Sequence, residues 1–133
     1  MMRSTVLLVL GCLLSPTWSG CAQQPVPAPE VAQMVLKVVV VSGAGAPVPA
    51  AGVVVKVLSR SDTLNVILRR SGKTDDAGAY LLQEVEYVGG WYPASIEVSP
   101  PAGSGLQAAT VRDSVQFVDR DPVVHVVQVV LSP

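Results

Sequence analysis

Any catalysis by this chain would have to work with a single histidine, His125. It lies in the valine-rich run Val123–Val127, which the sequence predicts to be a strand. A zinc peptidase needs several protein ligands at short spacing, and a serine hydrolase needs a base beside its nucleophile. His125 alone supplies neither set, and the sequence has no Gly-x-Ser-x-Gly motif. We therefore interpret His125 as an ordinary strand histidine and predict no catalytic residue, no cofactor and no enzymatic activity.

Two pairs of aspartates could bind a cation together with backbone carbonyls. Asp75 lies beside Asp76, and a second pair is formed by Asp119 and Asp121. Calcium takes about six to eight oxygen ligands, and neither pair brings enough carboxylates for that number. We therefore predict no metal site, and we expect these aspartates to cap turns.

The segment Thr74–Gly78 predicts a tight turn between two strands. Asp75 can accept hydrogen bonds from backbone N–H groups of the turn, and Gly78 can adopt the positive φ that reverses the chain. Both residues are therefore expected to have a structural role.

Two aromatic side chains near a Gly-Gly pair are candidates for contact with a ligand or partner. The segment Trp91–Val98 alternates, and its inward set begins with Tyr92, so that Trp91 should point outward beside Gly89-Gly90. Tyr87 precedes these glycines and should also be exposed. Exposed Trp and Tyr are typical of protein contact surfaces and of platforms on which sugars stack. We predict that Trp91 and Tyr87 contribute to binding.

The basic residues concentrate in one segment. Four of them lie between positions 59 and 73: Arg60, Arg69, Arg70 and Lys73. We interpret this segment as a long loop in which Thr63–Leu68 could form a short strand. The loop could contact an anionic envelope polymer or a partner protein, or it could simply be solvated. The formal net charge of −1 gives no long-range attraction to nucleic acid, and we predict no nucleic-acid partner.

The N-terminus has the layout of an export signal. Met1-Met2-Arg3 is a short basic start, and Ser4–Leu14 is apolar but shorter than the roughly 20 residues of a transmembrane helix. Ser19-Gly20 before Cys21 then resembles the bacterial lipobox. The resemblance implies cleavage before Cys21 and a diacylglycerol on its sulfur. Cys12 offers a second such box, and an ordinary cleaved secretory signal is the remaining alternative.

These features divide the chain into a lipoprotein signal peptide (1–20), a lipidated cysteine with a proline-rich tether (21–32) and one folded domain (33–133). Cys21 would then be the only cysteine of the mature chain, which leaves no partner for an internal disulfide. The anchor predicts a membrane as partner and a cell-envelope location. Ala22, where an Asp would resemble an inner-membrane retention signal, favours the outer membrane in a Gram-negative source. Without lipidation, the chain would be secreted.

Valine-rich segments divided by Gly and Pro predict an all-β domain. Half of the residues are hydrophobic but only 5% are aromatic, and valine favours strands. We predict strands over residues 34–41, 52–58, 79–85, 91–98, 108–118 and 123–131, in addition to the short one proposed above. About seven strands in about 100 residues are typical of a β-sandwich. In the first strand Met34 and Leu36 should face the core, and Lys37 should bring the opposite face to water.

Three motifs in order give a more specific resemblance. They are Pro47-Val48-Pro49-Ala50-Ala51-Gly52-Val53, Thr74-Asp75-Asp76-Ala77-Gly78-Ala79-Tyr80, and Gly90-Trp91-Tyr92 at the start of an alternating strand. From Val35 to Leu131, this order is similar to the carboxypeptidase regulatory-like domain, a transthyretin-like sandwich. The resemblance implies a non-catalytic accessory domain. The basic segment 59–73 and the additional glycine before Trp91 depart from the family pattern, and both concern loops.

Together these features predict a non-catalytic envelope lipoprotein whose β-sandwich is a structural or protein-interaction module. The alternative is a module that binds carbohydrate or another envelope polymer, with Trp91 and Tyr87 as its stacking surface. The extent of exposed aromatic surface around Trp91 would distinguish the two.

Overall fold

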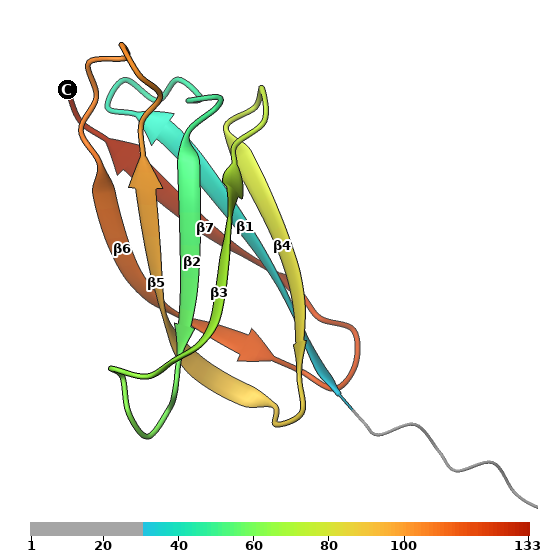
Figure 1. Cartoon of the computed structure of the whole chain (residues 1–133). Coiled ribbons are helices and arrows are strands. Elements are labelled where there is room, and N and C mark those ends of the chain that lie inside the picture. The colour runs from blue at the N-terminus through green and yellow to red at the C-terminus, as the bar shows by residue number, and fades with distance from the viewer. Residues whose placement is uncertain (1–30) are drawn as a thin grey trace, which may run out of the picture.

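The valine-rich segments form the strands of two stacked sheets. The computed structural model describes residues 31–133, and this part of the chain contains seven strands and no helix. The strands are β1 (Ala32–Ser42), β2 (Gly52–Leu58), β3 (Val66–Lys73), β4 (Ala79–Glu86), β5 (Gly90–Ser99), β6 (Ala109–Phe117) and β7 (Val124–Leu131), as Figure 1 shows. The predicted seven-stranded β-sandwich is confirmed.

Residues 31–133 contain no helix that could cross a membrane. The predicted signal peptide, Cys12, the predicted lipidation site Cys21 and most of the predicted tether lie outside the described residues.

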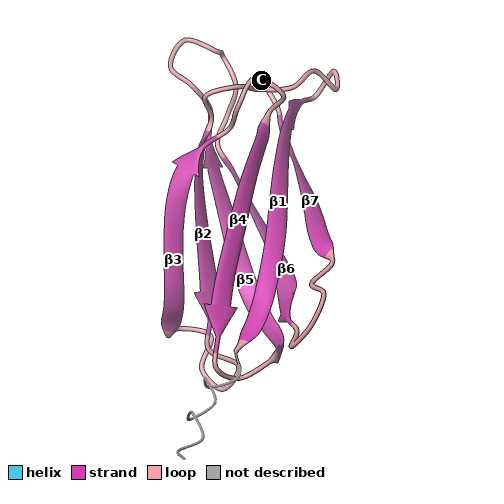
Figure 2. Ribbon diagram, turned by 90° about the vertical axis from the view of Figure 1, so that its right-hand side faces the viewer, coloured by secondary structure: helices cyan, strands magenta, loops and turns pink. Residues whose placement is uncertain are grey.

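One sheet has three strands in the order β4-β1-β7, and the other has four in the order β3-β2-β5-β6. The two sheets form separate layers in Figure 2. β1 is the central strand of the smaller sheet, antiparallel to β4 and parallel to β7, so the first and last strands are neighbours. This arrangement gives each sheet one inner face toward the core and one outer face toward solvent.

The core is built by strict alternation of side chains along the strands. The inward positions of β1, β2 and β5 are all at most 6% exposed: Met34, Leu36, Val38, Val40, Val53, Val55, Val57, Tyr92, Ala94, Ile96 and Val98. The inward positions predicted in β1 (Met34 and Leu36) and at the start of β5 (Tyr92) are confirmed. β6 and β7 add Val115, Phe117, Val127, Val129 and Leu131, and the Phe117 ring meets that of Tyr92 edge to face at a centroid distance of 5.3 Å.

The loops divide between the two ends of the sandwich. β1 begins at one end, which we call the entry pole, and the loops 59–65, 87–89 and 118–123 lie at the same end. The opposite end, the far pole, holds the loops 43–51, 74–78 and 100–108 and the last residues of the chain. In Figure 1 the entry pole is at the bottom and the far pole, with the C-terminus, is at the top.

The prediction of a long loop over 59–73 is wrong. β3 begins at Val66 and runs to Lys73, antiparallel to β2, so only the first part of the segment is a loop. β3 is an edge strand, and charged side chains are common there because they discourage pairing with another chain. Its Arg-Arg-Ser-Gly-Lys sequence hides the alternation that marks more buried strands.

The turn between β3 and β4 has the predicted chemistry. The Asp75 carboxylate Oδ1 accepts hydrogen bonds from the backbone N–H groups of Ala77 and Ala79, at 2.9 and 3.0 Å. Gly78 has a φ of +75°, in the left-handed region that favours glycine. Asp75 thus accepts hydrogen bonds from the turn, and Gly78 has the positive φ that the turn requires.

Candidate functional site

The four basic residues do not form one patch. Arg60 lies at the entry pole, where its Nη1 donates to the Gly89 carbonyl at 3.4 Å and its Cζ stands 4.7 Å from the centre of the Tyr92 ring. Arg69 and Lys73 belong to β3, and their positions face outward from the four-stranded sheet. The expectation that all four share one loop is therefore wrong, because most of the segment is strand.

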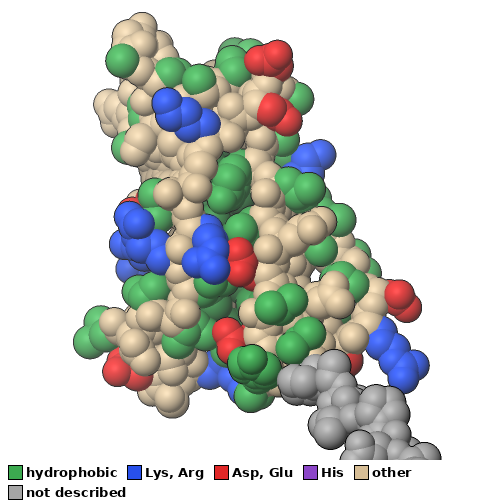
Figure 3. All heavy atoms as spheres, turned by 45° about the vertical axis from the view of Figure 1, so that its right-hand side comes forward, with side chains coloured by type: hydrophobic (Ala, Val, Ile, Leu, Met, Phe, Trp, Pro, Cys, Tyr) green, Lys and Arg blue, Asp and Glu red, His purple; other side chains and the backbone are tan. Residues whose placement is uncertain are grey.

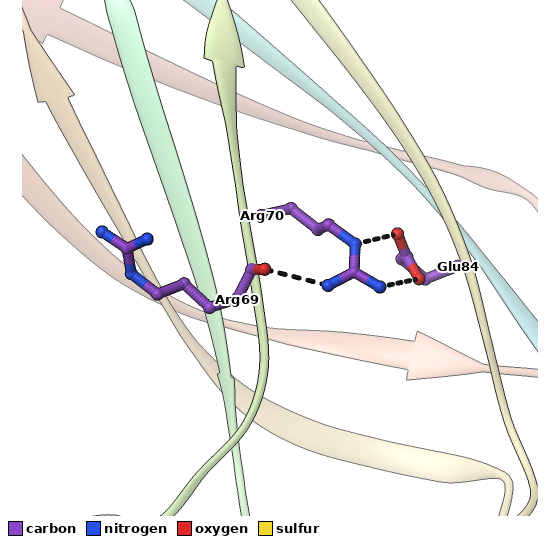
Figure 4. Close-up of polar contacts among 3 residues, drawn as sticks. All are labelled: Arg69, Arg70 and Glu84. Atoms are coloured by element: carbon purple, nitrogen blue, oxygen red, sulfur yellow. Dashed lines mark hydrogen bonds and ion pairs between the residues drawn. The ribbon is translucent and has the colours of Figure 1, made fainter.

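Arg70 points the other way and closes one open side of the sandwich. Its Nε donates to Glu84 Oε2 at 2.8 Å and its Nη2 to Glu84 Oε1 at 3.2 Å, while Nη1 donates to the Arg69 carbonyl at 2.9 Å. Figure 4 shows this pair bridging β3 and β4, the edge strands of different sheets. A two-pronged Arg–carboxylate pair fixes geometry well. Arg70 thus has a structural partner, and its predicted role in binding a ligand stays a prediction.

The opposite open side is bridged by His125. Its Nε2 lies 3.1 Å from Asp113 Oδ2, which connects β7 to β6. Partial burial tends to raise the pKa of Asp113, but the Ser114 backbone N–H and the His125 ring outweigh it and hold this pKa below its usual value of 3.8. The interpretation of His125 as a strand histidine with a polar partner agrees with this contact.

The Asp113–His125 contact predicts a small acid-sensitive contribution to stability. Because the pKa of Asp113 is lower in the folded chain, its stabilisation is present above about pH 4 and is lost as the pH falls through the folded-state pKa. Asp113→Asn should therefore lower the unfolding midpoint in urea slightly at pH 6, and the gap to the wild type should shrink toward pH 3. The effect is small because both side chains are about a third or more exposed. A gap that widens in acid would contradict the sign.

Trp91 borders a shallow groove at the entry pole. It is 55% exposed, as predicted, and faces Gln116 across the outer side of β5 and β6. The groove holds about 260 Å³ and is lined by Trp91, Gln116, Val118, Arg120, Asp121, Val123, Val124 and His125. Asp121 has a φ of +50°, which aspartate tolerates better than most residues. Tyr87 is 74% exposed at the same pole but does not line the groove. One aromatic ring beside several polar groups is a modest surface for sugar stacking.

The described residues offer little for metal chemistry. Within residues 31–133, no three side chains of His, Cys, Asp or Glu type are placed to share an ion. Of the four aspartates considered as cation ligands, Asp75 caps the β3–β4 turn, and Asp119 and Asp121 lie in the β6–β7 loop.

The outer face of the three-stranded sheet is apolar, which the sequence did not predict. Leu81, Val85, Val124, Val126 and Val130 are each 46–57% exposed on this face. They flank Val35, Val39 and Val41 of β1, and the polar members are Gln33, Lys37, Gln83 and Gln128. We call this set of residues the apolar face. Figure 3 shows green hydrophobic side chains extending down the right-hand half of the molecule to its lower end.

Lys37 is the only charged residue of the apolar face, and it lies at its centre. It is opposite Leu81 on β4 and opposite Val126 on β7. Lys37 is exposed as predicted, but it does not make this side of the sheet polar. The signal in the sequence was the loss of alternation, since β1 and β7 carry valine on both faces, as in Val38–Val41.

The outer face of the four-stranded sheet is polar by comparison. Lys56 of β2 pairs with Glu97 of β5 at 2.9 Å, and β6 adds Thr110, Arg112 and Ser114. A sheet with a core on one side normally shows this polar outer face. The contrast identifies the apolar face as the unusual surface of the domain.

Comparison with solved structures supports the fold and no more. The chain is similar to chlorocatechol 1,2-dioxygenase from Pseudomonas putida, with 12% identity and a TM-score of 0.54, over 77% of this chain and 61% of that enzyme. It is also similar to catechol 1,2-dioxygenase from Acinetobacter sp. ADP1 inhibited by bound mercury, with 15% identity, a TM-score of 0.53 and coverage of 78% and 53%. The chain thus spans less than two thirds of either enzyme, and what it shares with them is a β-sandwich. No protein-family model matches the chain, and no curated protein is similar to it in sequence.

Proposed function

We propose that this chain is a non-catalytic lipoprotein of the cell envelope, anchored through Cys21, whose β-sandwich binds another protein on its apolar face. The observation that carries the proposal is the set of exposed side chains on β4 and β7, Leu81, Val85, Val124, Val126 and Val130, which lie on either side of the half-buried Val35 and Val39 of β1. Monomeric domains rarely expose a contiguous apolar sheet surface of this kind. Strands that are apolar on both faces are usually covered on both faces.

The chemistry of the apolar face favours a protein over a bilayer or a sugar. Its centre holds the ammonium of Lys37, and its margins hold the amides of Gln33, Gln83 and Gln128. These groups would be left without partners in the hydrocarbon of a membrane, whereas a protein can offer a carboxylate and backbone groups to them. Sugars stack on aromatic rings, and this face has none.

The position of Lys37 also favours a different protein over a second copy of this chain. Two copies stacked face to face about a central twofold axis would bring their Lys37 side chains together. Like charges in such contact oppose association. The partner that fits is a largely apolar surface with an Asp or Glu at its centre.

Site-specific photo-crosslinking in cells that express the full chain tests this proposal. A benzophenone amino acid at Val126 should form an adduct with one discrete protein, whereas the same group at Arg112 on the polar face should not. Lys37→Glu should reduce the Val126 adduct roughly tenfold or more, because it places like charges opposite each other. Cooperative thermal unfolding of Lys37→Glu confirms that the fold is retained.

Three results would overturn the proposal. Equal adducts from Val126 and Arg112 would show that the apolar face has no preference for a partner. An adduct of twice the chain mass would identify a second copy instead. A Val126 adduct that Lys37→Glu leaves unchanged would show that the centre of the apolar face is not in contact with the partner.

The proposal retains the resemblance to the carboxypeptidase regulatory-like domain. Its support is that the three motifs fall on corresponding elements: the start of β2, the β3–β4 turn and the start of β5. Such domains act as accessory modules, which agrees with a chain that works by contact.

The anchor itself is tested with a clickable fatty acid, which should label the wild type and not Cys21→Ser. Label that persists on the Cys21→Ser variant would either place the anchor at Cys12 or exclude the proposed anchor altogether.

The carbohydrate alternative has one observation in its favour, the groove beside Trp91. The Trp91 ring could stack on a sugar ring, and Gln116, Arg120 and Asp121 line the same groove and could form hydrogen bonds with the sugar hydroxyls. Retention of the protein on a peptidoglycan or glycan column that disappears in Trp91→Ala would support it. Unchanged weak retention in both proteins would exclude it.

A further inference from the structure

The exposed apolar side chains in the loops gather at the entry pole. Leu64 is 92% exposed in the β2–β3 loop, and Val123 is 84% exposed in the β6–β7 loop. The β4–β5 loop adds Tyr87 at 74% and Val88 at 56%, and Trp91 follows it at 55%. Side chains from three separate loops and one strand end thus present an apolar and aromatic surface at one end of the domain.

The far pole has nothing comparable. Within residues 31–133, its loops 43–51, 74–78 and 100–108 contribute no member to the set of exposed large apolar side chains. These loops consist mainly of Gly, Ala, Pro, Ser and Asp. The apolar surface is therefore specific to the pole where the chain enters the domain.

The composition of the entry pole fits a lipid surface. Tyr and Trp prefer the boundary between lipid headgroups and acyl chains, since their rings are apolar and their polar atoms can remain hydrated. The loops at this pole carry two arginines, Arg60 and Arg120, and three aspartates, Asp62, Asp119 and Asp121, which is a net charge of −1. Attraction to anionic lipids would not drive such contact, but burial of apolar side chains would.

The length of chain ahead of the domain places this pole near a bilayer. Cys21 is ten residues before Val31, where the described chain begins at the entry pole. Ten residues span about 31 Å when fully extended as a proline-rich chain. A lipid on Cys21 would keep the pole within that distance of the membrane, at an effective concentration in the millimolar range. At that effective concentration, a state in which a few side chains insert weakly into the bilayer would be populated.

From these observations we propose that the entry pole rests on the lipid bilayer, with Leu64, Tyr87, Val88, Trp91 and Val123 in its interfacial layer. This inference rests on the proposed anchor at Cys21. It sets the orientation of the domain, because β1 rises from the membrane and the far pole points away from it. The apolar face runs along the side of the sandwich and stays accessible to a protein in the same envelope compartment.

Quenching of Trp91 fluorescence by brominated lipid tests the orientation. The full chain is expressed, purified with its lipid and reconstituted in phosphatidylcholine vesicles. Cleavage before Cys21 would remove Trp18, so that Trp91 is the only tryptophan of the lipidated wild type. Acyl chains brominated close to the headgroup should reduce Trp91 emission about twofold or more, because an interfacial ring lies at that depth. In the matched control, Trp91→Phe with Ala102→Trp, the tryptophan moves to the far pole and should not be quenched.

A second variant checks that the neighbouring side chains hold the ring in place. Tyr87→Ser with Val123→Ser removes apolar surface from two loops and should weaken the quenching of Trp91 without loss of cooperative unfolding. Fatty-acid labelling of Cys21 is recorded on the same samples.

The outcomes separate the two proposals. Labelled protein in which Trp91 and the relocated tryptophan of the Ala102→Trp control are equally unquenched would overturn the orientation and leave the anchor standing. Unlabelled protein that stays off the vesicles would overturn the anchor and the orientation with it. A Trp91 signal that ignores brominated lipid but changes on addition of peptidoglycan fragments would assign the pole to carbohydrate instead.

Discussion

Replacing Gly78 by valine is expected to destabilise the domain by about 3 kcal/mol or more, through two effects that add. A valine at a φ of +75° is strained by about 1–2 kcal/mol. Its Cβ would also lie 2.6 Å from the Val40 carbonyl oxygen and 3.0 Å from the Val48 backbone nitrogen, which belong to the core strand β1 and to the β1–β2 connection. The Gly78 carbonyl accepts the Val40 N–H at 2.7 Å, so moving the turn away would break that bond.

The matched control is Gly103→Val in the β5–β6 loop. Gly103 has nearly the same φ, +79°, but its Cβ would have no heavy atom within 4 Å. Its substitution should show the backbone strain alone, about 1–2 kcal/mol. Urea unfolding of both variants measures the difference. Equal losses of stability would show that the close approach to β1 contributes nothing.

Thr74→Val is expected to destabilise the domain by about 2–4 kcal/mol although the two side chains have almost the same shape. The Thr74 hydroxyl is buried; it donates to the Val48 carbonyl at 2.7 Å and accepts from the Ala51 N–H at 2.9 Å. A valine would leave both backbone groups without partners away from water. The β3–β4 turn and the β1–β2 connection would lose both hydrogen bonds made through the hydroxyl, and only the backbone bonds of Thr74 to Ala50 and Ala51 would still join them there.

The serine variant separates the hydroxyl from the methyl group. Thr74→Ser retains both hydrogen bonds and should lose only about 1 kcal/mol, mainly from the missing methyl. Thr110→Val on the outer face of β6 is the control for an exposed position and should stay within about 0.5 kcal/mol of the wild type. If Thr74→Val and Thr74→Ser unfold at the same urea concentration, the hydroxyl is not what matters.

Strands in which apolar and polar residues alternate, such as β5, can be predicted well from the sequence. The edge strand β3 cannot. β5 could be predicted residue by residue because Tyr92, Ala94, Ile96 and Val98 alternate with polar residues. β3 could not, because its inner face carries Arg70, which reaches Glu84 on the other sheet instead of filling the core. A charged residue that closes the side of a sandwich looks, in the sequence, like a residue of a solvated loop.

The candidate binding surfaces were only partly predictable. The exposure of Trp91 and Tyr87 followed from the alternation of β5 and the adjacent glycines. The apolar face did not, because one lysine at position 37 suggested that the whole face is polar. Its members come from three strands far apart in the sequence, and only the pairing of β1 with both β4 and β7 brings them together.

The parallel pairing of β1 with β7 has a consequence for the order of folding. Partners such as Val35 and Val124 are about 90 residues apart, so the smaller sheet cannot close until the end of the chain is available. Pairings of such long range fold slowly, because the entropy of closing the loop is lost before the contacts form. Until β7 is available, β1 has one edge unpaired and carries valines on both faces. We expect this intermediate to be the state most prone to aggregate and the one that most needs a chaperone.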